Sequence, residues 1–103
     1  MKIQVNFGDV PSSDALTQHV NERVEAALQH MAEQITRVEV HLRDDNSDKA
    51  GPDDKRCTME ARIAGLQPLA VEHADRDLYQ VVNEAAGKLR RAVQRTLDRR
   101  EKR

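Results

Sequence analysis

The sequence predicts an α+β fold in which a four-stranded sheet carries two helices on one face, in the order β-α-β-β-β-α. Four short segments alternate between apolar and polar residues, as half-buried strands do. Two longer segments repeat apolar residues every three or four positions, which is typical of helices with one buried side. Elements with a single apolar face bury that face best when they pack as two layers. The other face of the sheet is then left to solvent or to a partner.

Length and composition indicate one small domain over residues 1–103. Phe7 and Tyr79 are the two aromatic residues, so the core must be aliphatic. The one cysteine, Cys57, cannot form an internal disulfide and fits a reducing compartment. There is no apolar run long enough to span a membrane and no signal peptide, so we expect a soluble cytoplasmic protein.

The first strand is expected at residues 2–7, and Gly8 and Pro11 break regular structure after it. Ser13 is the expected N-cap of an amphipathic helix of about 18 residues, because its hydroxyl can accept a hydrogen bond from a free amide of the first turn. The apolar positions of this helix are Leu16, Val20, Val24, Leu28 and Met31.

The middle of the chain alternates again at residues 35–43 and 55–63, which we expect to be strands. Between them, residues 44–54 form a polar loop with five Asp, and a short fourth strand is expected at residues 68–73. The predicted inward residues are Ile3, Val5, Phe7, Val38, Val40, Leu42, Cys57, Met59, Ala61, Ile63, Leu69 and Val71.

The final helix is expected to begin near Asp75 or Asp77, either of which could cap it. Its predicted apolar stripe faces the sheet and consists of Leu78, Val82, Ala85, Leu89, Ala92, Val93 and Thr96.

Positive charge is concentrated at this end of the chain. The formal net charge is −1, but residues 1–86 hold nine Lys/Arg and sixteen Asp/Glu, whereas residues 87–103 hold eight Lys/Arg and two Asp/Glu. At 100° per residue, one outward flank of about 80° carries a row of cations, while Arg90 and Arg100 lie off it. The members of this row are Lys88, Arg91, Arg95, Arg99 and Lys102.

Cations stabilise the negative C-terminal end of a helix, but this effect fades beyond the last turn and does not explain Lys88, Arg91 and Arg95. Neighbouring like charges repel each other, and a polyanionic partner would relieve that repulsion. The row therefore predicts an anion-binding stripe on the final helix.

Two segments resemble the ribosome hibernation promoting factor and ribosome-associated inhibitor family, whose members are also called sigma-54 modulation proteins. One is the helix ALTQHVNERVEAAL, which includes Arg23, and the other is ADRDLYQVVNEAAGKLRRAVQR. The residues that carry the second likeness are Asp77, Leu78, Tyr79, Lys88, Leu89, Arg91 and Arg95. The resemblance covers nearly the whole chain, includes the order of elements, and points to a short form of the family.

The resemblance implies binding to the small ribosomal subunit, in the channel used by messenger and transfer RNA, and a block of translation under stress or in stationary phase. It also implies contacts to ribosomal RNA from basic helix and strand residues, by a monomer that needs no cofactor and no small-molecule substrate. The candidate RNA-binding residues are Lys88, Arg90, Arg91, Arg95, Arg99, Arg23, Arg62 and Tyr79. Tyr79 either packs at the edge between sheet and helix or stacks on RNA.

Two other functions remain open: a protein-binding regulator that acts through the acidic surface, and a general binder of double-stranded RNA. The loop around Asp44 resembles a calcium loop, but Lys49 and Lys55 stand where glycine and glutamate are required. Cys57 and the four histidines lack the spacing of a zinc site. Phosphate-binding loops and nucleophile-elbow motifs are absent from the sequence, so we expect neither a metal site nor an enzyme.

Overall fold

The structure, a computed structural model, describes residues 1–44 and 55–101. The predicted acidic loop beyond Asp44, and the last two residues of the basic segment, lie outside the described residues. The elements, in chain order, are β1 (Lys2–Phe7), α1 (Asp14–Leu28), the short 3₁₀ helix η1 (Gln29–Gln34), β2 (Ile35–Asp44), β3 (Lys55–Ile63), β4 (Leu69–Asp75) and α2 (Leu78–Glu101). This order confirms the predicted α+β fold.

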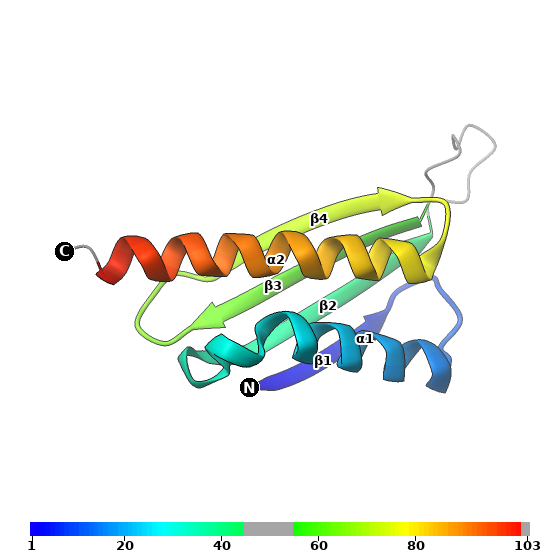
Figure 1. The fold of residues 1–103 in the computed structure, drawn as a ribbon. Coiled ribbons are helices and arrows are strands. Elements are labelled where there is room, and N and C mark those ends of the chain that lie inside the picture. The colour runs from blue at the N-terminus through cyan, green and yellow to red at the C-terminus, as the bar shows by residue number, and fades with distance from the viewer. Residues whose placement is uncertain (45–54, 102–103) are drawn as a thin grey trace.

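The four strands form one mixed sheet in the order β1-β2-β3-β4. β1 pairs with β2 in parallel, and the other two pairs are antiparallel. A parallel pair needs a crossover connection, which α1 supplies. Figure 1 shows both helices side by side on the same face of the sheet, with α1 over the β1 side and α2 over β3 and β4.

The core between sheet and helices is aliphatic, as predicted. The inward residues of β2 and β3 are all buried, and those of the outer strands β1 and β4 are partly buried against the same cluster. Burying a side chain such as Leu or Val contributes roughly 1.5–3 kcal/mol, so this layer holds the two helices on the sheet. In the described part of the chain, no helix is both long enough and apolar enough to cross a membrane.

The first helix begins as predicted but ends earlier. The Leu16 amide donates to the Ser13 hydroxyl at 3.2 Å, which confirms Ser13 as the N-cap. The α-helix stops at Leu28, and η1 tightens the chain before it enters β2 at Ile35. Such 3₁₀ turns are common at helix ends, and this one keeps Met31 buried without continuing the α-helix.

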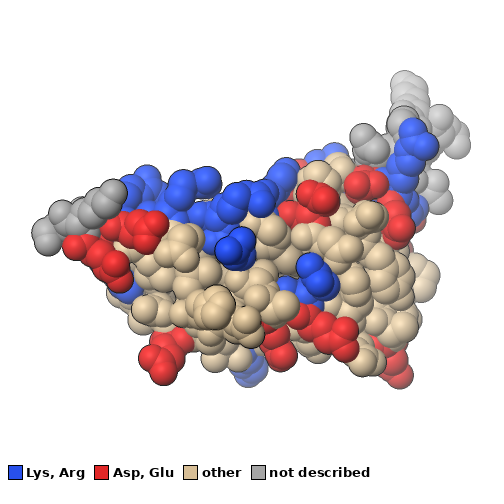
Figure 2. All heavy atoms as spheres, in the orientation of Figure 1, with Lys and Arg blue, Asp and Glu red and all other residues tan. Residues whose placement is uncertain are grey.

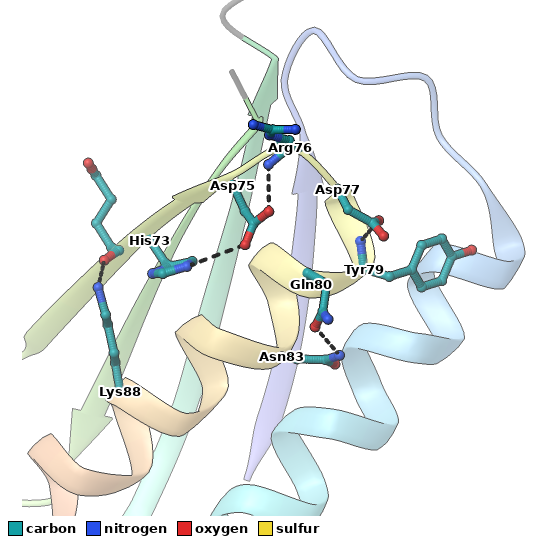
Figure 3. A network of polar contacts seen from close by, with 9 residues as sticks. His73, Asp75, Arg76, Asp77, Tyr79, Gln80, Asn83 and Lys88 are labelled. Atoms are coloured by element: carbon teal, nitrogen blue, oxygen red, sulfur yellow. Dashed lines mark hydrogen bonds and ion pairs between the residues drawn. The ribbon is translucent and has the colours of Figure 1, made fainter. Parts of the chain in front are cut away.

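The second helix is capped by Asp77 rather than Asp75. The carboxylate of Asp77 accepts from the Tyr79 amide at 2.9 Å, as Figure 3 shows. Asp75 belongs to β4, which extends two residues beyond the predicted strand, and it lies 3.8 Å from the ring of His73.

The buried side of α2 is wider than the predicted stripe. Val81, Ala86 and Leu97 are also buried, because α2 packs against α1 as well as against β3 and β4. A helix that contacts two neighbours buries a broader part of its circumference than one that only covers a sheet.

Candidate nucleic-acid interface

Four arginines of α2, which are Arg90, Arg91, Arg95 and Arg99, extend into solvent. Within the described residues, none of these four side chains forms a hydrogen bond or an ion pair. The nearby carboxylate of Asp98 instead accepts from Gln94 at 2.9 Å. Figure 2 shows the Lys and Arg side chains gathered along the margin of the molecule over α2, whereas Asp and Glu side chains gather near the start of this helix. We call these four residues the arginine row.

Lys88 departs from the predicted outward flank. Its side chain is half-buried, and its ammonium group crosses to β4, where it donates to the backbone carbonyl of Glu72 at 3.0 Å (Figure 3). On the helical wheel, Lys88 lies only about 20° from the buried Val81, so its aliphatic stem can lie along the sheet. Arg100 also has a partner, because it donates to the carbonyl of Ala64, in the turn after β3, at 2.9 Å.

Three members of the arginine row surround one surface hollow. Arg90, Arg91 and Arg95 line it together with Gln94, and its volume is about 250 Å³. Each guanidinium group can donate two parallel hydrogen bonds to a phosphate. The arrangement is therefore suited to a phosphate group or another small anion.

Arg90, which lies off the predicted flank, faces α1 instead. Together with Arg23 of α1 it lines a second hollow, of about 360 Å³, between the two helices. The structure thus brings the predicted residues Arg23 and Arg90 together. The sequence reasoning missed this hollow and two further residues that line it, His30 and Asn83. The sequence did contain a signal for this hollow, because each helix has two adjacent small residues where it lines the hollow: Ala26 and Ala27 in α1, and Ala86 and Gly87 in α2.

Arg62 lies on the face of the sheet that points away from the helices, so the structure does not bring it together with the arginine row. Its guanidinium lies 3.8 Å from the carboxylate of Glu60. Other arginines of this face are paired in the same way, with Arg37 at 2.9 Å from Glu39 and Arg56 at 2.5 Å from Glu72.

Tyr79 lies at the start of α2, about 18 Å along the helix axis from Arg91. Its ring packs edge-on against His19 of α1, with 4.8 Å between ring centroids, and 42% of the residue remains exposed. His19 in turn lies 2.8 Å from the side-chain oxygen of Asn83. Tyr79 therefore packs at the junction of the two helices, while part of its ring faces solvent.

Cys57 is unsuited to covalent chemistry. Burial raises the pKa of its thiol to about 12, so the reactive thiolate is scarce at neutral pH. In residues 1–44 and 55–101, no three His, Cys, Asp or Glu side chains gather where they could hold a metal ion.

Comparisons with known proteins agree with this architecture. Residues 3–101 match the family model described as sigma 54 modulation protein / S30EA ribosomal protein. A ribosomal subunit interface protein from Coxiella burnetii has a similar structure, with a TM-score of 0.79, 16% identity, and coverage of 95% of this chain and 99% of that chain. The N-terminal domain of Protein Y from Thermus thermophilus is also similar, with a TM-score of 0.74, 20% identity, and coverage of 93% and 99%. A comparison with curated proteins gave no match. At such low identities, the two structures show a shared fold.

Proposed function

The chain belongs to the sigma 54 modulation protein / S30EA ribosomal protein family, and we propose that it is a ribosome-associated hibernation factor. It binds the RNA of the small ribosomal subunit in the channel for messenger and transfer RNA, and it blocks translation under stress or in stationary phase. The name of the Coxiella burnetii protein, a ribosomal subunit interface protein, supports this proposal.

The observation that carries the proposal is the arginine row. Its cations lie on one helix without an ion pair from the described residues, and three of them surround one hollow. Lys and Arg that neutralise phosphates release counterions, so each contact adds affinity that falls as salt rises. Structured RNA is read mainly through its shape and backbone, so a row of guanidinium groups carried by one helix is a suitable reader.

The remaining surface favours one orientation on a polyanion. Residues 1–86 carry a net charge of −7, and carboxylates such as Asp75 and Asp77 lie where α2 begins. RNA is repelled there and attracted along the C-terminal part of α2. The protein then acts by occupying space that messenger and transfer RNA need, and no chemical step is required.

Sedimentation of the full chain through sucrose gradients, with ribosomes from stationary-phase cells, tests the proposal. We expect co-migration with small subunits or whole ribosomes that is lost at high salt and after nuclease treatment. Co-migration with a protein partner that is indifferent to nuclease would support the protein-binding regulator instead. Equal binding to any RNA duplex would support a general binder of double-stranded RNA.

A further inference from the structure

The hollow between α1 and α2 is built from matching segments of the two helices. Each segment places two small residues side by side, with a larger polar residue one turn before and one turn after them. On the α1 side the lining residues are Arg23, Ala26, Ala27 and His30, and on α2 they are Asn83, Ala86, Gly87 and Arg90. In α2 the spacing i, i+3, i+4, i+7 puts all four residues on one helix face, and in α1 the spacing i, i+3, i+4 does the same for Arg23, Ala26 and Ala27, while His30 follows in η1. The small side chains of both helices thus form the floor of the hollow, and the larger polar side chains form its rims.

The rims of the hollow are positively charged. Arg23 and Arg90 are exposed, and within the described residues neither forms an ion pair or a hydrogen bond. Among the described residues, no Asp or Glu lines the hollow, although the chain contains 18 acidic residues. The hollow thus presents two guanidinium groups beside a floor that carries no charge.

Gly87 deepens this floor inside a continuous helix. Glycine is among the poorest helix formers, so its place in the middle of α2 calls for a local reason. A Cβ atom added at Gly87 would meet only the guanidinium of Arg91, at 3.4 and 4.0 Å, so the packing of the core does not demand a glycine. The guanidinium of Arg91, a member of the arginine row, therefore lies near Gly87.

One end of the hollow is closed by a small polar network. The side-chain oxygen of Asn83 lies 2.8 Å from the His19 ring, and its amide group donates to Gln80 at 3.2 Å, as Figure 3 shows for the second contact. Because the Asn83 side chain is held by these two partners, it lines this end of the hollow in a fixed position. Arg90 lines both this hollow and the hollow of the arginine row.

We propose that this hollow receives one unpaired nucleobase of an RNA strand whose phosphates lie on the arginine row. The inference rests on the proposed function and specifies which part of the RNA the protein selects. A volume of about 360 Å³ is near the lower end for small-ligand sites and excludes a duplex. The floor of Ala and Gly can contact the face of a flat ring, and guanidinium groups stack on bases as well as binding phosphates.

Short RNA hairpins test this assignment with the full chain. One hairpin carries a single bulged nucleotide, a second carries an abasic residue at the same place, and a third is fully paired. The first two have the same number of phosphates, so electrostatic attraction is equal. We expect the bulged hairpin to bind at least about fivefold more tightly than the abasic one, because the abasic residue loses base stacking. Equal affinity for these two hairpins would overturn the proposal.

A pair of matched substitutions tests the hollow itself, because one fills it and the other leaves it open. Ala26→Leu places a bulky side chain on the floor, whereas Ala15→Leu makes the same change at an exposed position of α1 outside the hollow. We expect Ala26→Leu to abolish the preference for the bulged over the abasic hairpin, and Ala15→Leu to retain it. A preference that survives in Ala26→Leu contradicts the assignment.

Two further measurements distinguish a failure of the nucleobase site from a failure of the proposed ribosome binding. Adenosine monophosphate is the free-nucleotide probe, and affinity for it equal to that for the bulged hairpin would overturn the assignment to RNA. If Ala26→Leu shows no hairpin preference but still co-migrates with ribosomes, the hollow recognises a base and the arginine row holds the ribosome. If the wild-type chain never co-migrates with ribosomes, the proposed function fails, whatever the hairpins show.

Discussion

The two arginine-bearing surfaces of this protein differ in how their charge is balanced. On the open face of the sheet, Arg37, Arg56 and Arg62 each lie within 4 Å of a glutamate, at 2.9, 2.5 and 3.8 Å. On α2, the arginine row has no such partner among the described residues. The residue type is the same, but the first surface is internally neutralised and two of its three arginines are half-buried, whereas the arginine row is exposed and unpaired among the described residues.

The position of the carboxylates, rather than the number of arginines, therefore decides which surface keeps an uncompensated positive charge. On the sheet, the register places Arg37 opposite Arg62 and Glu39 opposite Glu60, so like charges face each other across the strands. Each arginine finds its glutamate elsewhere, two positions along its own strand or on the next strand. A polyanion approaching the sheet would meet arginines that are already paired with carboxylates, whereas one approaching the C-terminal part of α2 would meet guanidinium groups without a carboxylate partner among the described residues.

The largest effect is expected from neutralising three arginines on each surface. Arg91→Gln, Arg95→Gln and Arg99→Gln together should weaken ribosome binding about 1000-fold, because each lost charge-assisted phosphate contact is worth roughly tenfold or more. The slope of log affinity against log salt should also fall by about 2–3, since each phosphate contact contributes roughly 0.7–0.9.

The matched control removes the same charge from the sheet, by Arg37→Gln, Arg56→Gln and Arg62→Gln. We expect its ribosome affinity, measured by the same salt titration, to stay within about threefold of wild type, because these guanidinium groups are already paired. Equal losses in the two triple variants would refute the distinction between the surfaces.

A second test uses Cys57, whose buried thiol lies in β3 between the two surfaces. Because its pKa is raised from 9.0 to about 12, alkylation by iodoacetamide at pH 8 should be at least about 100-fold slower than in the urea-unfolded chain. The triple variant of α2 should keep this protection, which would show that its binding defect is not a folding defect. Rapid alkylation of the folded α2 variant would mean that the row also holds the core together.

The raised pKa also sets a direction for stability against pH. Above about pH 9 the unfolded chain loses the thiol proton, whereas the folded chain keeps it up to about pH 12. The unfolded state then binds fewer protons, so stability should fall as pH rises through this window. Cys57→Ala should show a shallower fall in melting temperature than wild type over the same pH range.

A third test compares two glycines, one within α2 and one in the turn after β3. Gly87→Ala should raise the free energy of unfolding by up to about 1 kcal/mol, since alanine is the better helix former and meets only the movable Arg91 side chain. Gly65→Ala, at the turn after β3, should lower it by about 1 kcal/mol, because Gly65 has φ +79°, where a Cβ is strained. Urea unfolding measures both, and a loss of stability in Gly87→Ala would mean that the helix needs this glycine.

The smallest expected effect is a change in the free energy of unfolding that has opposite signs for one arginine on each surface. Arg95→Gln should stabilise the fold by about 0.2–0.5 kcal/mol, because it removes repulsion from Arg91 and Arg99 one turn away. Arg56→Gln should destabilise it by about 0.2–1 kcal/mol, because it breaks the pair with Glu72. Urea titrations at low salt measure both, and the contrast should shrink as salt is raised. If both substitutions changed the free energy of unfolding in the same direction, the charges of the two surfaces would not be balanced differently.

The fold was largely predictable because periodicity is a local property. The alternation around Val40 and Met59 and the helical repeat from Leu16 to Leu28 identified the layers and the core correctly. The end of α1 was not predictable, since the 3₁₀ turn depends on where the chain must enter β2. The width of the buried side of α2 depends on its contact with α1, which periodicity in one helix does not reveal.

The site was less predictable because it depends on distances between elements. Arg62, one of the expected RNA-binding residues, lies apart from the arginine row, because an outward residue of a strand lies on the face away from the helices in a two-layer fold, and its part in RNA binding stays a prediction. Lys88 sits at the border of the buried stripe, and only the position of β4 decides whether it reaches solvent or the sheet. The hollow with Arg23 and Arg90 exists because α1 and α2 lie side by side. The relative position of two helices cannot be derived from the periodicity of a single sequence.

The bond from Lys88 to β4 has a consequence beyond recognition. β4 is the last strand of the sheet, so the carbonyl of Glu72 that accepts this bond points to the unpaired edge. Such an edge is a template on which a strand of another molecule can add itself and begin aggregation. By occupying this acceptor with a charged group, the lysine removes one hydrogen-bonding position that an added strand would need.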